Sequence, residues 1–184
     1  SAELSMCSSA PVLTHILARE EVLGRIDDEA GVELATELSR RIESIAESLG
    51  IERVRSSTDQ HIFAAGLGTP ETAADLAADF ALQVVEAIDD FRQSHGVEVT
   101  YRAGMSAGHV IAGLLSADEL TYGVLGEPSR VALALAGVAG SNQILIDSET
   151  AADLEGPWVL ETATGLVDLR GNALTAMVLR GRET

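Results

Sequence analysis

Apolar residues recur at helical spacing in three stretches of the chain. The clearest stretch is 29–49, where apolar positions lie three or four apart and Gly50 follows at the position of a helix C-cap. A second stretch, 69–94, opens with a Thr-Pro pair typical of an N-cap and a first helical position. A third, 128–140, starts at proline and closes at glycine. The pattern therefore predicts two long helices and a shorter one.

Shorter apolar stretches with β-branched residues predict strands, and their order indicates the fold. Segments 51–56 and 61–67 predict a hairpin joined by turn residues, and 97–108 and 109–116 predict a second pair of strands. The other predicted strands are 11–18, 120–126, 142–147 and two final ones around 167–171 and 173–180. The order β, α, β, β, α, β is typical of an α+β fold with a ferredoxin-like βαββαβ sheet and helices on one face, here with extra C-terminal strands.

The length and composition predict one globular domain. The chain has 184 residues, of which 46% are hydrophobic, enough for a single core. We expect residues 1–10 to form a flexible N-terminal tail and residues 11–184 to form the domain. Cys7 is the only cysteine, and the first ten residues lack the features of a secretory signal. The longest uncharged apolar stretch, 103–115, is shorter than the roughly 18 residues of a membrane span. These features predict a cytoplasmic protein without membrane contact.

The charge of the chain excludes several partner classes. Twelve arginines and no lysine stand against 29 acidic residues, which gives a formal charge of -17. Such an acidic surface repels nucleic acid and anionic membranes, so we expect neither as a partner. A basic set made only of arginine also favours a GC-rich bacterial source.

Two short motifs resemble known functional patterns, but each lacks other residues that its pattern requires. Residues 104–108 fit the G-x-S-x-G nucleophile elbow, but the only later histidine is His109 and no helix is predicted there. We therefore interpret these glycines as a tight β-turn or bulge. Residues 66–71 begin like a dinucleotide fingerprint but lack its third glycine and its later acidic residue, which favours a strand-to-helix loop.

Five stretches, in order, carry a resemblance to a known family. They are 33–50, the hairpin 53–66, 101–116, 120–135 with 142–147, and 167–171. The hairpin resembles the metal-carrying hairpin of class III adenylate and guanylate cyclases, and the other stretches agree in order and spacing. The resemblance extends from about Pro11 to Leu179 and implies the nucleotide cyclase fold, which contains the ferredoxin-like sheet.

The resemblance implies a metal site that this chain has altered. In active members two aspartates, on the first strand and in the hairpin, hold two Mg or Mn ions against the nucleotide. Asp59 stands at the hairpin position, but His15 replaces the first-strand aspartate, and a neutral imidazole is a poor Mg ligand. Thr58 replaces a glycine, and its Cβ would crowd a phosphate. We interpret Asp59 as a turn residue and remnant of a metal site, and we expect no cofactor, with Mg or Mn only if residual cyclase activity exists.

The remaining family positions belong to the second subunit of a head-to-tail dimer or to the nucleotide pocket. Arg130 replaces the asparagine that orients the ribose, and Ala134 replaces the arginine that stabilises the transition state. Purine choice involves the positions of Arg55 and Gly123, and Arg170 replaces a lysine that contacts the triphosphate. No intact catalytic residue is therefore expected, and a homodimer should not cyclise ATP.

Three functional hypotheses remain open. The first is a degenerate cyclase domain that acts as a regulatory dimer module, paired with itself or with another cyclase-like domain. The second is a sensor that binds a purine nucleotide or another anion without turnover, through Arg55, Arg130 and Arg170. The third is one half of a heterodimeric adenylate cyclase that forms cAMP and pyrophosphate. We interpret His15 as a core or interface histidine and His61 and His109 as solvent-facing strand residues.

Overall fold

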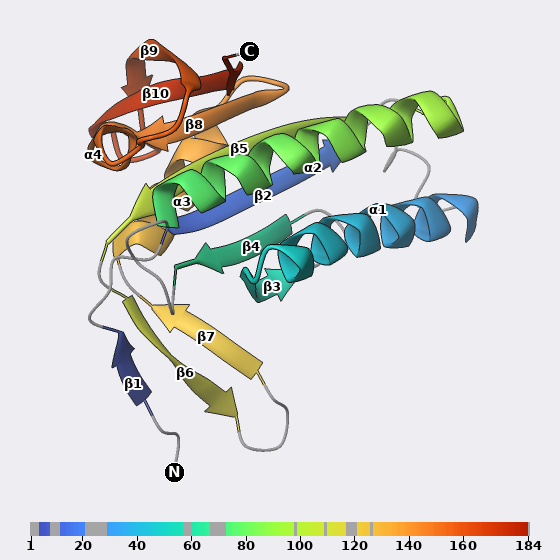
Figure 1. The fold of residues 1–184 in the computed structure, drawn as a ribbon, viewed down its shortest axis with the longest axis horizontal. Helices are drawn as coiled ribbons and strands as arrows, with labels where there is room; N and C mark the ends of the chain where they lie inside the picture. Colours follow the sequence, from blue (N-terminus) through green and yellow to red (C-terminus); the bar gives the residue numbers. More distant parts are fainter. Residues whose placement is uncertain are drawn as a thin grey trace.

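The computed structural model describes residues 4–7, 12–20, 29–56, 60–66, 73–97, 99–108, 110–116, 121–125 and 127–183. Its elements are β1 (Leu4–Cys7), β2 (Val12–Glu20), α1 (Glu29–Ser48), β3 (Glu52–Ser56), β4 (Gln60–Ala65), α2 (Ala73–His95), β5 (Val99–Ala107), β6 (Val110–Ser116), β7 (Thr121–Leu125), α3 (Glu127–Val138), β8 (Gln143–Asp147), α4 (Ser148–Ala152), β9 (Trp158–Val167) and β10 (Ala173–Arg182). The predicted α+β class, the two long helices and the shorter one are confirmed (Figure 1). Thr69 and Pro70 lie outside the described residues.

A seven-stranded sheet with the order β3-β4-β2-β5-β8-β10-β9 forms the body of the molecule. Its first four strands pair antiparallel in the ferredoxin-like order, which confirms the predicted βαββαβ core. The C-terminal strands extend this core, because β8 pairs parallel to β5 and β10 pairs antiparallel to both β8 and β9. Gly50 and Gly96 end α1 and α2 with positive φ angles, as C-cap glycines do.

Helices cover both faces of this sheet, so the expectation of helices on one face is wrong. Alternate residues of β5 point to opposite sides: Ala103 and Met105 join the large core under α1 and α2, whereas Gly104 faces α3. In β8, Leu145 joins a separate cluster with α3. Helical periodicity predicts that α3 has an apolar face, but it does not say which side of the sheet that face covers.

Gly104 explains how α3 reaches the sheet. A Cβ atom at this position would lie 2.0 Å from the carbonyl oxygen of Ala132 and 2.6 Å from the amide nitrogen of Ala136. Only glycine lets the helix backbone come this close to the strand. The motif 104–108 is therefore no tight turn or bulge: Gly104 to Ala107 continue β5, and Ser106 is a buried strand residue.

A second sheet, with the order β1-β6-β7, projects from the body (Figure 1). The predicted pairing of 97–108 with 109–116 is wrong, because both edges of β5 are taken by β2 and β8 and β6 pairs with β1 and β7 instead. Within the predicted N-terminal tail, Leu4–Cys7 pair antiparallel with β6. None of the described helices has the length and apolarity that crossing a bilayer would require.

The C-terminal elements differ from their predicted positions. The segment 167–171 is the turn between β9 and β10 rather than a strand, and β9 precedes it as Trp158–Val167. Polar turn chemistry explains the difference, because Asp168 accepts hydrogen bonds from the amides of Arg170 and Asn172. The short helix α4 begins after Asp147, whose carboxylate caps it by accepting from the Thr150 amide at 3.0 Å.

Candidate functional site

His15 lies on the central strand β2, in one row that crosses the sheet. Its Cα partners are Ile62 on β4 and Gly104 on β5, and Ile62 in turn pairs with Arg55 on β3. Gly104 in this row faces α3. The sheet thus brings two predicted site positions, His15 and Arg55, within two strands of each other, or about 10 Å.

The hairpin carboxylate cannot be placed beside this row. Asp59 and Thr58 lie outside the described residues, between β3 and β4. Among the residues that the structure does describe, no three His, Cys, Asp or Glu side chains converge as metal ligands do. The donor set also has the wrong chemistry, because one carboxylate and one imidazole do not match the oxygen ligands that two Mg ions require. We therefore derive no chemistry through a metal at this site.

Helix α3 carries the two positions that the family resemblance predicts for ribose orientation and transition-state charge. Its inner face is buried through Ala132, Leu135 and Ala136, and Ala139, just after the helix, is buried as well. Arg130 is exposed and Ala134 half-buried, one helical turn apart on the outer side. Leu133 is 46% exposed beside them. Ala134 carries no charge, and Arg130 is the one arginine in the sequence of α3.

The two positions associated with purine choice lie on neighbouring strands of different sheets. Gly123 is on β7, opposite Gly113 of β6, and β7 contacts β3, the strand that carries Arg55. The structure therefore brings the Arg55 and Gly123 strands together. Gly123 offers no side chain that could read a purine edge.

Arg170 lies at the exposed tip of the β9–β10 hairpin. Asp168 organises the turn: its carboxylate accepts from the Arg170 amide at 2.8 Å, and from the Asn172 amide at 2.9 Å and side chain at 3.0 Å. The hydrogen bond from the Asn172 side chain, followed by that from its amide, holds the pKa of Asp168 below its ordinary value. Leu169 beside it is fully exposed. The turn therefore presents a cation and an apolar side chain on a pre-organised backbone.

Sequence reasoning misplaced one histidine of the hairpin. His61 is 1% exposed, so the interpretation of His61 as solvent-facing is wrong. It lies on the same face of β4 as Phe63, with ring centroids 6.5 Å apart, because residues two apart in a strand point to the same side. His109 lies outside the described residues. The alternation of the strand predicts the side of His61, but the helix that covers this side comes from later in the chain.

Sequence reasoning also missed two polar networks that hold the body together. Ser106 donates to Asp147 at 2.6 Å, which links β5 to β8 and to the cap of α4. On the other side, Asp75 of α2 accepts from the Gly156 amide at 2.9 Å and from the Trp158 indole. Burial tends to raise the pKa of Asp75, but the hydrogen bonds donated by Trp158, Gly156 and Glu155 outweigh it, so this pKa lies below its ordinary value. Asp75 lies about 80 residues from Gly156 in the sequence, too far for a local motif to reveal this contact.

Comparison with known proteins identifies the class to which this arrangement belongs. The model of the adenylate and guanylate cyclase catalytic domain matches residues 13–181, and the chain belongs to this family. An adenylate cyclase of Mycobacterium tuberculosis (strain ATCC 25618 / H37Rv) is 25% identical over 133 residues, which are 72% of this chain and 30% of that protein. Adenylate cyclase type 9 of Xenopus laevis is 26% identical over 156 residues, which are 83% of this chain and 12% of that protein. The chain thus spans less than a third of the length of these curated relatives.

Solved structures agree on the fold. The guanylate cyclase domain of RhGC from Catenaria anguillulae, in complex with GTP, has a TM-score of 0.82 at 19% identity, covering 95% of this chain and 98% of that one. The adenylyl cyclase CyaB from P. aeruginosa also has a TM-score of 0.82, at 15% identity and 96% coverage of both chains. A non-canonical dimeric guanylyl cyclase domain from Blastocladiella emersonii has a TM-score of 0.79 at 18% identity, covering 100% of both chains. The predicted nucleotide cyclase fold is therefore confirmed.

Proposed function

We propose that this chain is a catalytically degenerate cyclase domain that acts as a regulatory dimer module in cyclic nucleotide signalling. The observation that carries the proposal is Ala134, half-buried on the outer side of α3 where the family uses a transition-state arginine. Removal of one such charge-stabilising group lowers a rate by about 100- to 1000-fold. His15 on β2 removes one of the two metal-binding carboxylates as well. Both halves of the family site are therefore weakened in the same chain.

The chain retains the fold on which association with a second domain would depend. The family model matches residues 13–181, and α3 packs closely on Gly104. Leu133 on the outer side of α3 and Leu169 at the hairpin tip are both exposed apolar residues, 46% and 105% accessible. Leu133 lies beside Arg130 and Ala134, the positions that the resemblance places at the second subunit, which supports pairing with a second cyclase-like domain, either this chain or another. Such a module would work in the cytoplasm, where cyclic nucleotides are made.

A combined experiment tests this proposal. The purified chain is titrated calorimetrically with ATP and GTP, each with Mg and then Mn, and the same samples are assayed for cyclic product. Its self-association is followed by sedimentation velocity over a concentration series. We expect no cyclic product, and self-association or capture of an added cyclase domain. Formation of cyclic nucleotide by the chain alone would overturn the proposal.

A second candidate function is binding of a purine nucleotide without turnover. Arg130 favours it, because its exposed position one turn before Ala134 keeps a guanidinium on the outer side of α3. Arg170 adds a second exposed cation at the hairpin tip. Calorimetric binding of ATP or GTP that is lost in Arg130→Ala and Arg170→Ala would favour this candidate over the first. The heterodimeric enzyme ranks last, since Ala134 and His15 damage both of the halves that such a chain could supply.

A further inference from the structure

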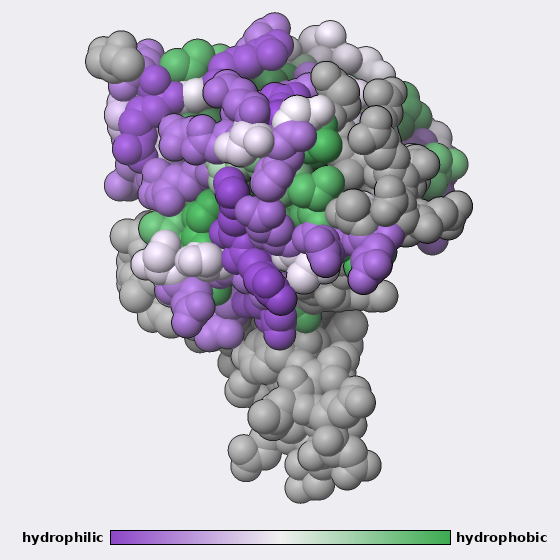
Figure 2. Space-filling view, turned by 90° about the vertical axis from the view of Figure 1, so that its right-hand side faces the viewer, coloured by the Kyte–Doolittle hydropathy of each residue, from purple (hydrophilic) through white to green (hydrophobic). Residues whose placement is uncertain are grey.

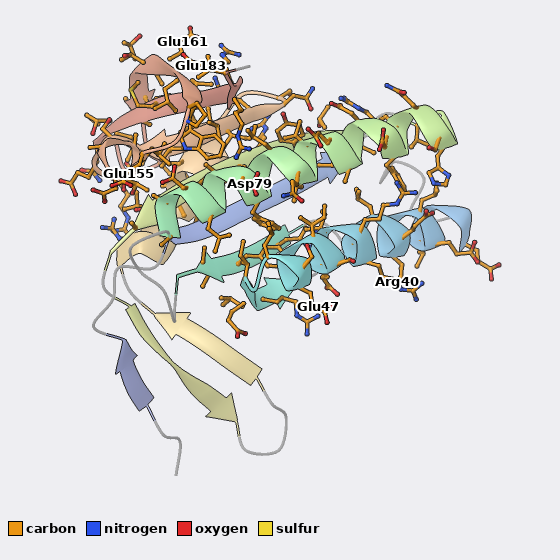
Figure 3. All side chains as sticks on the ribbon, in the orientation of Figure 1. Arg40, Glu47, Asp79, Glu155, Glu161 and Glu183 are labelled. Atoms are coloured by element: carbon orange, nitrogen blue, oxygen red, sulfur yellow. The ribbon has the colours of Figure 1, made fainter. Side chains whose placement is uncertain are left out.

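An open cavity lies where the first turns of α2 meet the start of β9 and the end of β10. Its volume is about 470 Å³. The lining residues are Asp75, Leu76, Asp79, Glu155, Gly156, Pro157, Trp158 and Arg182. The cavity is separate from the row of His15 and Arg55 and from the outer side of α3, so none of the predicted cyclase positions contributes to it. Figure 3 shows Asp79 on α2 and Glu155 before β9 at this junction.

The cavity is acidic and has an aromatic wall. Three carboxylates, those of Asp75, Asp79 and Glu155, line it together with one cation, Arg182. Asp75 is fully engaged, because it accepts hydrogen bonds from the Trp158 indole and from two backbone amides. Asp79 accepts from the Gln83 side chain at 3.0 Å and from Arg182 at 3.3 Å, and Glu155 is exposed. An excess of carboxylates beside an indole ring is the chemistry that recognises an organic cation.

The chain itself already binds a guanidinium in this place. The Cζ atom of Arg182 lies 4.6 Å from the centre of the Trp158 ring, and one of its nitrogens donates to Asp79 at 3.3 Å. The side chain is nevertheless 52% exposed, so water reaches it and its ion pair with Asp79 is weak. Arg182 is the last residue of β10, near the end of the described chain. Because Arg182 is exposed and ends β10, we expect that a second guanidinium could take its place.

We propose that this cavity recognises an arginine side chain of a partner protein, and that Arg182 occupies the guanidinium position in the free chain. The indole face and Asp79 form the recognition elements, while Glu155 and the net charge of -17 attract a basic segment. The proposal does not depend on cyclase activity or on the dimer proposed above. If the proposal is correct, Arg182 competes with the partner's arginine for the same position. A salt bridge with a purely structural role would not compete with a partner.

The test uses the fluorescence of Trp158, the only tryptophan of the chain. N-acetyl-L-argininamide is the probe, and uncharged N-acetyl-L-glutaminamide is the matched control ligand. In Arg182→Gln the probe should bind at least about threefold more tightly than in the native chain, because the tethered competitor is gone. Adding Asp79→Asn to that variant should weaken binding again by about threefold or more. The control Glu47→Gln, which removes one exposed carboxylate on α1, should leave binding unchanged (Figure 3).

Several results would overturn the proposal. One is a fluorescence response in Arg182→Gln that does not saturate or that the glutamine analogue reproduces. Another is weaker binding in Arg182→Gln than in the native chain, which would mean that Arg182 only supports the cavity wall. If Arg182→Gln fails to fold in a thermal melt, Arg182→Lys replaces it, because lysine keeps the charge and most of the stem. The lysine variant should bind the probe more tightly than the native chain, and no change in its affinity would also count against the proposal.

Discussion

The two sides of helix α3 differ in what they retain of a cyclase domain. The inner side packs directly on Gly104 of β5, where a single Cβ atom would meet the Ala132 carbonyl at 2.0 Å. The outer side carries Arg130 and Ala134, the two predicted site positions of this helix, and Leu133, which is 46% exposed. The inner contact specifies one helix position on the sheet, whereas Arg130 and Leu133 are exposed. The fold can therefore be preserved when the residues of the outer side change.

This difference shows why fold and activity must be argued separately. The packing of α3 on β5 and β8 depends on the small residues of its inner side and on the cluster around Leu135 and Leu145. Catalysis would depend on charges at the surface, which contribute little to stability. Under the proposed function, replacement of those charges would leave the sheet, the core and the similarity to solved cyclase domains intact. The predictions below test the two sides in order of their expected effect on the free energy of unfolding.

The largest effect is expected for Gly104→Val on the inner side. The new side chain would overlap the α3 backbone, so the helix must move away from the sheet and open the cluster around Leu135. We expect a loss of about 4 kcal/mol or more, or failure to fold, measured by urea unfolding. The matched control is Gly137→Ala in the same helix, where an added Cβ meets nothing within 4 Å. That control should gain roughly 0.5–1 kcal/mol, because alanine is the better helix former. Equal effects of the two variants would contradict the assigned close approach.

A smaller but distinct loss is expected at the junction of α2 with β9. In Asp75→Ala the amides of Glu155 and Gly156 and the Trp158 indole lose their acceptor, which should cost about 1–3 kcal/mol. The control is Asp90→Ala, an exposed acid in the same helix, which should cost less than about 0.5 kcal/mol.

The carboxylate of Asp75 should also make the stability of the fold depend on pH in the acidic range. The folded state holds the pKa of Asp75 below its ordinary value of 3.8, so its contribution is complete above that pH and is lost as the pH falls through the folded pKa. Urea unfolding at pH 7 and below pH 3.8 should therefore give a smaller difference between Asp75→Ala and the native chain at the acidic pH. A difference that grows on acidification would contradict this sign.

The elements of the fold could be predicted from the sequence further than their arrangement. The periodicity of 29–49 and the turn residues after Ser56 are local signals, and they correctly indicate α1 and the β3–β4 hairpin. The side of the sheet that α3 covers depends on Gly104, a residue that local reasoning assigned to a turn. The pairing of β6 with β1 and β7 depends on which edges of β5 are already taken. Both features depend on contacts between residues that are distant in the sequence, and local periodicity carries no information about such contacts.

For the candidate site too, the sequence predicts individual positions but not how they come together in the fold. The order of motifs led to the positions of His15, Arg55, Arg130, Ala134 and Arg170, and the structure aligns the first two in one row of the sheet. The acidic cavity at Trp158 could not be predicted, because its walls come from α2 and from the last strands. On the face that Figure 2 shows, purple hydrophilic residues cover much of the described part, and their distribution does not indicate which charges act together. Only the folded chain brings them into one cavity.

Restoring the outer side should change activity with little change in stability. A variant with His15→Asp, Arg130→Asn and Ala134→Arg returns the family residues to both halves of the site. Because Arg130 is exposed and Ala134 half-buried, the two α3 changes should each alter the free energy of unfolding by less than about 0.5 kcal/mol. We expect cyclic product with Mn in the triple variant and none in a variant that lacks only Ala134→Arg. A well-folded, dimeric triple variant without product would show that the loss of activity has another cause.

The smallest effect on stability is expected for Leu133→Gln, which tests the outer side as an association surface. Leu133 is already 46% exposed, so a polar replacement should change the free energy of unfolding by less than about 0.5 kcal/mol. Val32→Gln is the matched control, because Val32 on α1 is 47% exposed on the opposite side of the sheet. If the outer side of α3 is the association surface, sedimentation velocity should show weaker self-association for Leu133→Gln only. Equal self-association of both variants and the native chain would place the contact elsewhere, and the outer side of α3 would then have lost the family chemistry without gaining a regulatory role.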